Sequence, residues 1–208
     1  MYVFGGWDGT TYFNDLYLLN LEKMTWKMPH TSGQAPYPRC GHAAVLVGTK
    51  LLIHGGFYFN EAKYRTAGAM YGTALRESYL GDLRVLDTTT LVWGRILTGG
   101  LPPLPRMGHT LIMSGSLLIM LGGWTLESNS TKKSQSGSGD CEYFRVVNSV
   151  SMEWDYGAYM GASPLARFGH TATPIGPHIL LFGGWEGTKP THEVLVLRDI
   201  TTSQPTER

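Results

Sequence analysis

The sequence predicts an all-β protein made of repeated, short-stranded sheets. Three markers recur in phase, namely a diglycine that follows an apolar run, a Gly-His pair and a tryptophan. Each histidine lies 13 residues before the first glycine of a diglycine and 16 residues after a tryptophan. Because fixed spacing between unlike markers is typical of structural repeats, we expect one recurring unit. The markers are Gly5, Gly6, Gly55, Gly56, Gly122, Gly123, Gly183, Gly184, His42, His109, His170, Trp26, Trp93 and Trp154.

Each repeat predicts four short strands. The first begins at the Gly-His pair, the second is the apolar run before the diglycine, the third is a run of the LYLLN type, and the fourth is centred on the tryptophan. Second-strand runs such as residues 51–53 and 179–182 are continuously apolar, which indicates strands that are covered on both faces. Segments rich in Gly and Pro, such as TSGQAPYPR and TGGLPPLPR, separate one repeat from the next.

All variation in repeat length is confined to one loop, between the diglycine and the third strand. From the first glycine to the residue before that strand, which is Asp15, Asp82 or Tyr143, the distances are 10, 27 and 21 residues. The two longer loops are inserts at residues 57–81 and 124–140. We therefore expect a constant scaffold whose inserts emerge on one face.

This unit of about 50 residues resembles the kelch repeat. The linker pattern Gly-x-x-Pro-x-Pro-Arg-x-Gly-His runs from Gly33 to His42 and returns from Gly99 or Gly100 to His109, whereas the third copy has Ala166 in place of a proline. The linker is most similar to that of stand-alone kelch proteins and the host-cell-factor-like group. The resemblance covers nearly the whole chain and implies a kelch-type β-propeller with about four four-stranded blades.

The predicted blades are bounded by the markers. We expect them at about residues 1–30, 39–96, 106–157 and 167–200 of a single propeller segment, 1–208. The first blade begins inside its second strand, and Gln204 stands where the fourth blade should have its tryptophan. Kelch rings usually have six or seven blades, so we expect part of a larger ring that other residues or another chain complete.

Composition narrows the function classes. The chain has 17 basic and 16 acidic residues and a formal charge of +1, which does not favour binding to nucleic acid or to an anionic membrane surface. No run reaches the roughly 18 apolar residues of a membrane span. Cys40 and Cys141 have no metal-ligand spacing. We expect a cytoplasmic protein with no cofactor, no metal ion, no nucleic acid and no membrane contact.

The repeat markers themselves are expected to be structural. The diglycines match no nucleotide-binding pattern, and glycine suits a turn with unusual φ or a close approach to a neighbouring blade. A histidine or tryptophan present in every blade indicates hydrogen bonding or blade packing rather than a single site. No set of nucleophile, base and orienting group can be assembled, so we expect no catalytic residues and no enzymatic activity.

The candidate partner-binding residues lie on the face that has the inserts. If the four strands alternate in direction, this face also has the linkers that join the blades. The first insert is rich in Tyr and Arg, residue types that are common in binding hot spots. The resemblance implies that arginines before the Gly-His pairs bind acidic peptides in related adapters; hydrogen bonding between blades is the alternative. The candidates are Arg39, Arg106, Arg167, Tyr58, Phe59, Tyr64, Arg65, Tyr71, Arg76 and Tyr79.

These observations favour a non-catalytic scaffold for protein–protein interaction. We expect it in a larger cytoskeletal or ciliary assembly, with unidentified protein partners. One alternative is a substrate-recognition subunit of a ubiquitin ligase. Another is a propeller enzyme of the galactose oxidase or sialic-acid epimerase kind.

Overall fold

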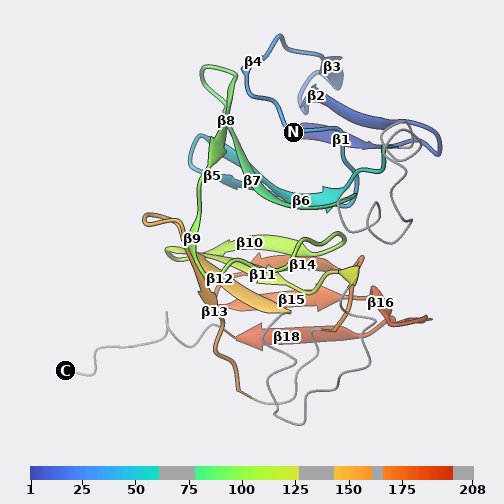
Figure 1. Cartoon of the computed structure of the whole chain (residues 1–208), viewed down its shortest axis with the longest axis vertical. Helices are drawn as coiled ribbons and strands as arrows, with labels where there is room; N and C mark the ends of the chain where they lie inside the picture. Colours follow the sequence, from blue (N-terminus) through green and yellow to red (C-terminus); the bar gives the residue numbers. More distant parts are fainter. Residues whose placement is uncertain (61–77, 127–142, 161–165, 199–208) are drawn as a thin grey trace, which may run out of the picture. The chain divides into compact units, whose positions relative to one another are not determined.

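The fold is almost entirely β. The computed structural model describes residues 1–60, 78–126, 143–160 and 166–198, and these contain four main sheets and one small hairpin (Figure 1). The chain divides into two compact units, Met1–Ile96 with Pro105–Met107 and Leu97–Leu104 with Gly108–Arg208. Each unit contains two of the main sheets, which we call blades 1 to 4 in chain order.

Blades 1 and 2 form the first unit. Blade 1 is an antiparallel sheet of β1 (Tyr2–Trp7), β2 (Tyr12–Asn20) and β3 (Thr25–Lys27). Blade 2 has the antiparallel order β5 (Ala43–Val47), β6 (Lys50–Phe57), β7 (Tyr79–Asp87) and β8 (Val92–Ile96). The short strand β4 (Ser32–Gly33) pairs in parallel with β8 and extends this sheet to five strands.

Blades 3 and 4 form the second unit. Blade 3 consists of β10 (Thr110–Ser114), β11 (Leu117–Leu121), β12 (Phe144–Asn148) and β13 (Glu153–Tyr156), with β9 (Gly99–Gly100) added in parallel to β13. Blade 4 consists of β14 (Thr171–Ile175), β15 (His178–Phe182) and β18 (Val194–Arg198). The hairpin of β16 (Trp185–Glu186) and β17 (Lys189–Pro190) lies between β15 and β18 in the chain.

The linkers contribute strands that the sequence did not predict. Gly33 of β4 pairs with Trp93, and Gly100 of β9 pairs with Trp154. Each linker therefore hydrogen-bonds to the fourth strand of the blade that follows it. The same pairing shows that Gly100, rather than Gly99, is the counterpart of Gly33.

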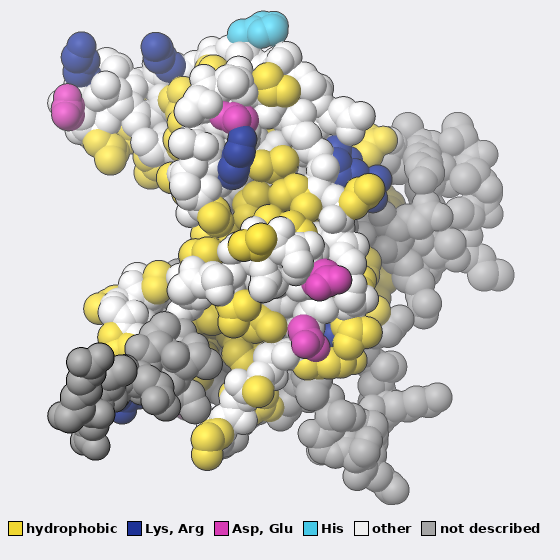
Figure 2. Space-filling model, turned by 90° about the vertical axis from the view of Figure 1, so that its left-hand side faces the viewer, with side chains coloured by type: hydrophobic (Ala, Val, Ile, Leu, Met, Phe, Trp, Pro, Cys, Tyr) yellow, Lys and Arg dark blue, Asp and Glu magenta, His cyan; other side chains and the backbone are white. Residues whose placement is uncertain are grey.

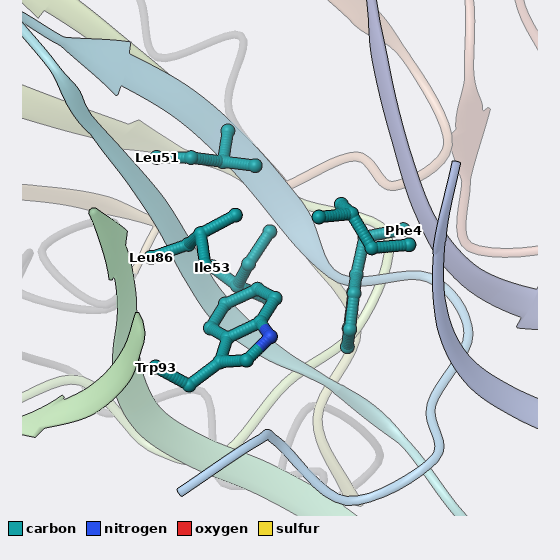
Figure 3. Close-up of a cluster of buried hydrophobic side chains, with 6 residues drawn as sticks. Phe4, Leu51, Ile53, Leu86 and Trp93 are labelled. Atoms are coloured by element: carbon teal, nitrogen blue, oxygen red, sulfur yellow. The ribbon is translucent and has the colours of Figure 1, made fainter. Parts of the chain in front are cut away.

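Apolar side chains from two blades meet in the core of each unit. In the first unit, Phe4 and Leu16 of blade 1 form a buried cluster with Leu51, Ile53, Leu86 and Trp93 of blade 2. The ring centroids of Phe4 and Trp93 are 5.1 Å apart, and Figure 3 shows the two rings close together. In the second unit, the corresponding cluster contains Ile112, Ile119, Leu121, Ile179 and Leu181. The apolar run 51–53 is thus covered on both faces, as predicted, whereas the run 179–182 is covered on one face only, since Ile179 and Leu181 are buried and Phe182 is 54% exposed.

The tryptophans of the repeat differ in burial. Trp93 is 3% exposed because blade 1 covers it, and Trp154 is also 3% exposed. Trp26 is 55% exposed, and the aromatic ring that it contacts is Tyr17, on its own blade. The same repeat position is therefore a packing position in blade 2 and a surface position in blade 1.

The diglycine is a crowded turn between blades. Gly5 has a φ of 59°, and a Cβ there would lie 2.9 Å from the carbonyl oxygen of Arg39 on blade 2. Gly56 has a φ of 106°, and a Cβ there would lie 2.8 Å from the carbonyl oxygen of Cys40 on its own blade. Both positions require glycine, because a left-handed backbone and close approach coincide. The second glycine also bonds to the next blade, since Gly6 N donates to Arg39 O at 2.9 Å.

Candidate functional site

The three predicted arginines lie inside their blades. Arg39 and Arg106 are fully buried, and Arg167 is 1% exposed. Arg39 donates through Nη1 to the Gly55 carbonyl (2.9 Å) and to Oδ1 of Asp82 (2.8 Å), and through Nη2 to Oδ2 of Asp82 (3.1 Å). Its Nε donates to the Tyr37 carbonyl at 3.0 Å. From its place just before the first strand, the guanidinium therefore hydrogen-bonds to the diglycine turn and to the acidic residue that precedes the third-strand run.

Blade 4 repeats this arrangement with a different acid. Arg167 donates to the Gly183 carbonyl at 3.2 Å, to Oε1 of Glu186 at 2.7 Å and to Oε2 of Glu193 at 3.4 Å. Glu193 directly precedes the run VLVLR of β18, and Asp82, within β7, directly precedes the run LRVLD. An acidic residue at this position therefore pairs with the arginine of its own blade.

The electrostatics of this pair favour the charged carboxylate. Burial raises the pKa of Asp82, but hydrogen bonds and positive charge from Arg39 and Arg84 lower it by more, to about 2. The prediction that Arg39, Arg106 and Arg167 are displayed to bind acidic peptides does not fit this structure. Their guanidinium groups are buried, and those of Arg39 and Arg167 bind acceptors within their own blades.

Two of the Gly-His histidines, His42 and His170, pack at the boundary between the blades of a unit. His42 lies against Phe4 of blade 1 with ring centroids 5.5 Å apart, and Nε2 of His170 is 3.1 Å from Oγ1 of Thr110 on blade 3. Burial lowers the pKa of His42 and of His170 to about 4, with a further contribution from the arginine three residues before each. Both histidines are therefore neutral at pH 7. His109 is 4% exposed.

Five aromatic residues form a continuous surface on blades 1 and 2. We call them the aromatic rim: Trp7, Tyr12, Phe57, Tyr58 and Tyr79. Trp7 stacks on Tyr12 with centroids 6.0 Å apart, and Tyr12 meets Tyr58 edge-on at 5.5 Å. Phe57 meets Tyr79 edge-on at 5.1 Å. Trp7 is 56% exposed, and the other four are partly exposed.

The rim is positioned by the ends of two hairpins. Trp7 and Tyr12 pair across the β1–β2 hairpin, and Phe57 and Tyr79 pair across the β6–β7 hairpin. Residues 57 and 79–81, at the ends of the first predicted insert, therefore lie in strands. The aromatic rings lie at the face where the diglycine turns emerge, which is the face that the sequence predicted for binding.

The structure describes only some of the predicted partner-binding residues of the first insert. Tyr58 and Tyr79 belong to the aromatic rim, and Phe59 is a partly exposed neighbour. Tyr64, Arg65, Tyr71 and Arg76 lie outside the described residues.

Trp7 and Tyr12 were not predicted as site residues. A sequence signal for Trp7 exists, because each of the four diglycines that follow a second-strand run is followed directly by Phe or Trp. No comparable signal exists for Tyr12, whose contacts with Phe57 and Tyr58 depend on the packing of two blades.

Tyr12 also lies near the thiol of Cys40. Burial raises the pKa of Tyr12, and the negative charge that Cys40 would acquire raises it further. Burial raises the pKa of the Cys40 thiol as well. Both groups therefore remain protonated at neutral pH, which suits packing and hydrogen bonding rather than nucleophilic attack.

Within residues 1–60, 78–126, 143–160 and 166–198, no group of three or more His, Cys, Asp or Glu side chains is placed to hold a metal ion. The same residues include no helix that is long and apolar enough to cross a membrane.

The exposed surface is rich in apolar groups. Figure 2 shows a face where hydrophobic side chains lie among uncharged polar groups and few charged ones. Exposed apolar side chains in the first unit include Trp7 and Trp26 (56% and 55% exposed). Exposed aromatics with neighbouring uncharged surface are typical of protein-binding sites.

Comparison with known proteins identifies related chains. The model of the KLHDC2/KLHL20/DRC7 Kelch-repeats domain matches residues 1–184. Human host cell factor 2 is 29% identical over 212 residues and 90% of this chain, and the tip elongation aberrant protein 1 of Schizosaccharomyces pombe is 28% identical over 188 residues and 90% of it. The Rho GTPase-activating protein gacHH of Dictyostelium discoideum is 35% identical over 122 residues and 59% of the chain. The matches cover 25%, 15% and 7% of these three relatives. The predicted all-β fold of kelch-type blades and the similarity to host cell factors are confirmed.

Proposed function

Because this chain belongs to the Kelch-repeats domain family, whose members generally mediate protein–protein interactions, we propose that it is a non-catalytic interaction scaffold. We propose further that the aromatic rim is its principal binding surface. The observation that supports this choice is the gathering of five aromatic rings from two hairpins, with Trp7 left 56% exposed.

An exposed aromatic cluster offers a protein partner a large apolar area at a low cost in entropy. Aromatic side chains bury a large area with few rotatable bonds, and Tyr adds a hydroxyl that can form hydrogen bonds at the periphery. Contacts among the five rings restrict their rotamers before binding, which lowers the entropy lost on association. An apolar protein segment is therefore the ligand that this surface fits best.

We also propose a cytoplasmic setting within a larger, cytoskeleton-associated assembly. Support comes from two relatives, the tip elongation aberrant protein 1 and the Rho GTPase-activating protein gacHH. In both relatives the matching region is a small part of the chain, which suits a binding module within a larger protein.

The test is proximity capture with matched surface variants. Trp7→Ala combined with Tyr58→Ala should lose the proteins that the unaltered chain captures after crosslinking and mass spectrometry. Trp26→Ala is the control, because Trp26 is almost equally exposed (55%) on the same blade but lies outside the rim. Equal capture by all three chains would reject the rim as the binding surface. Turnover of a small molecule without any captured protein would reject the scaffold function itself.

A further inference from the structure

The linkers between blades place prolines close to the aromatic rim. In the first unit Pro36 is buried, and its carbonyl accepts a hydrogen bond from Nδ2 of Asn14 at 3.3 Å. Pro105 lies against Gly81, since a Cβ on this glycine would lie 3.3 Å from Cγ of Pro105. Asn14 and Gly81 occupy the same position of the repeat, because each directly precedes the acidic residue before the third-strand run.

These contacts continue from the rim along two strands. Tyr12 precedes Asn14 by two residues in β2, and Tyr79 precedes Gly81 by two residues in β7. Two residues of a strand span roughly 7 Å. We propose that the aromatic rim binds a proline-rich segment of a partner protein in the polyproline II conformation. This inference rests on the proposed function of the rim as a protein-binding surface.

The chain's own linkers show how these strands hold a proline-containing segment. No residue of 34–38 or 101–105 belongs to a strand. In both linkers the residue after the last proline donates its backbone N–H to the blade, from Arg39 to the Phe13 carbonyl at 3.0 Å and from Arg106 to the Leu80 carbonyl at 3.1 Å. Because proline has no N–H, the residues before each arginine are held by packing and through their carbonyls. The surface beside the rim therefore accepts such segments without β pairing.

The rim of blade 2 offers side chains rather than an unpaired strand edge. Phe57 exchanges two backbone hydrogen bonds with Cys40, of 3.0 and 2.8 Å, and pairs with Tyr79 on its other side. Tyr58 donates its backbone N–H to the Ser78 carbonyl at 2.9 Å. A polyproline II segment suits this surface, because it is recognised by aromatic side chains and needs no main-chain pairing.

The polar groups of the rim complement a proline-rich ligand. The indole N–H of Trp7 only donates, and the hydroxyls of Tyr12, Tyr58 and Tyr79 can donate. Burial, with a smaller effect from Cys40, raises the pKa of Tyr12, so its hydroxyl keeps its proton. A proline-rich segment offers carbonyl acceptors and few N–H donors. It is also extended before binding, so it loses little entropy when its rings pack on the aromatic side chains.

The test compares two peptides with the same fluorescent label, SPPLPPLPPS and SAALAALAAS, by fluorescence anisotropy with the full 208-residue chain. The insert between Tyr58 and Tyr79 contains no proline, so the probe is a separate peptide. The proline peptide should bind at least roughly tenfold more tightly than the alanine peptide. Trp7→Ala should weaken its binding roughly tenfold, and Tyr58→Phe, which removes one donor, roughly fivefold. Trp26→Ala and Tyr17→Phe are the matched controls and should leave the affinity unchanged, because both side chains are exposed on blade 1 outside the rim (55% and 37%).

Three results would overturn the proposal: equal affinity for the two peptides, equal affinity of the Trp7→Ala and unaltered chains for the proline peptide, or no binding up to the solubility limit. The proposed function is judged separately, because the capture experiment uses no peptide. Loss of captured proteins in the chain with Trp7→Ala and Tyr58→Ala, together with equal binding of the two peptides, would reject the proline-rich ligand and retain the rim as the binding surface.

Discussion

At the scale of single residues, breaking the buried arginine pair of blade 2 should cost more stability than breaking a surface pair. Arg39 is fully buried, so removing Asp82 leaves its guanidinium charge without a carboxylate, whereas Asp82 keeps its ion pair with Arg84, at 2.7 Å, when Arg39 is removed. We predict that Asp82→Asn lowers the free energy of unfolding by about 3–5 kcal/mol, measured by urea denaturation. Lys50→Gln, which removes the exposed pair with Asp87, should change it little. Similar losses for the buried and exposed pairs would contradict this assignment.

A second residue-scale prediction concerns His54 and pH. Burial, with a smaller effect from Arg106, lowers the pKa of His54 to about 3. In the unfolded chain the pKa is about 6.5, so the unfolded state binds the proton first and stability falls as pH drops below 6.5. The folded group stays neutral until about pH 3.

His54→Leu should retain the fold, because Phe4 and Leu121 occupy the same position in blades 1 and 3. Urea titrations between pH 6.5 and 5 should show a slope smaller than in the unaltered chain, by a difference that grows to about 1.4 kcal/mol per pH unit at the low end of this window. An unchanged slope would mean that His54 is not a neutral buried histidine. Asp82 does not contribute in this window, since its lowered pKa removes stability only as pH falls from about 4 towards 2.

The sequence could not decide whether the arginines of the repeat are buried or exposed. Arg39, Arg106 and Arg167 share a motif that is equally compatible with display to solvent and with burial. The arginine can be buried because it pairs with the acidic residue that precedes the third-strand run. These two residues lie far apart in the sequence and meet only in the folded blade. The contacts of Tyr12 likewise depend on two hairpins from different blades.

At the scale of elements, the burial of the fourth-strand tryptophan depends on whether another blade packs against it. Trp93 is 3% exposed and lies against Phe4, whereas Trp26 is 55% exposed. We predict that Trp93→Ala lowers the free energy of unfolding by about 3–5 kcal/mol and that Trp26→Ala changes it by less than about 1 kcal/mol. Thermal or urea unfolding of the two variants gives a direct comparison. A large loss at Trp26 would show that its exposed face is covered in solution.

The linker strand β9 provides a second element-scale prediction. A Cβ on Gly100 would lie 2.2 Å from the Trp154 carbonyl oxygen, and its φ is 73°. Gly115 has a similar φ of 56° but no heavy atom within 4 Å of such a Cβ. Gly115→Ala should therefore cost about 1–2 kcal/mol from backbone strain alone.

Gly100→Ala should cost more than Gly115→Ala and should speed amide exchange in the segment that pairs with β13. Hydrogen-exchange mass spectrometry on both variants separates the clash from the strain. Equal stability and equal exchange would show that β9 does not depend on close approach.

At the scale of the whole molecule, the order and type of the strands could be predicted because three markers keep their spacing through the chain. The runs before Gly55, Gly122 and Gly183 form second strands as expected. The parallel strands β4 and β9 could not be predicted, since two-residue segments have no periodicity to detect. The binding surface could be predicted only as a face, because its residues come together through contacts between blades.

Because the chain forms two compact units, we predict that a substitution in the core of one unit destabilises mainly that unit. Ile53 is fully buried in the cluster of the first unit, and Leu181 is fully buried in that of the second. Each substitution to alanine should cost about 2–5 kcal/mol within its own cluster. Because local opening follows the contacts that are lost, Ile53→Ala should speed amide exchange in β1, β2 and β5–β8 more than in β10–β15. Leu181→Ala should show the reverse pattern. If either variant raises exchange equally in both units, the chain unfolds as one cooperative body, and the two clusters stabilise each other.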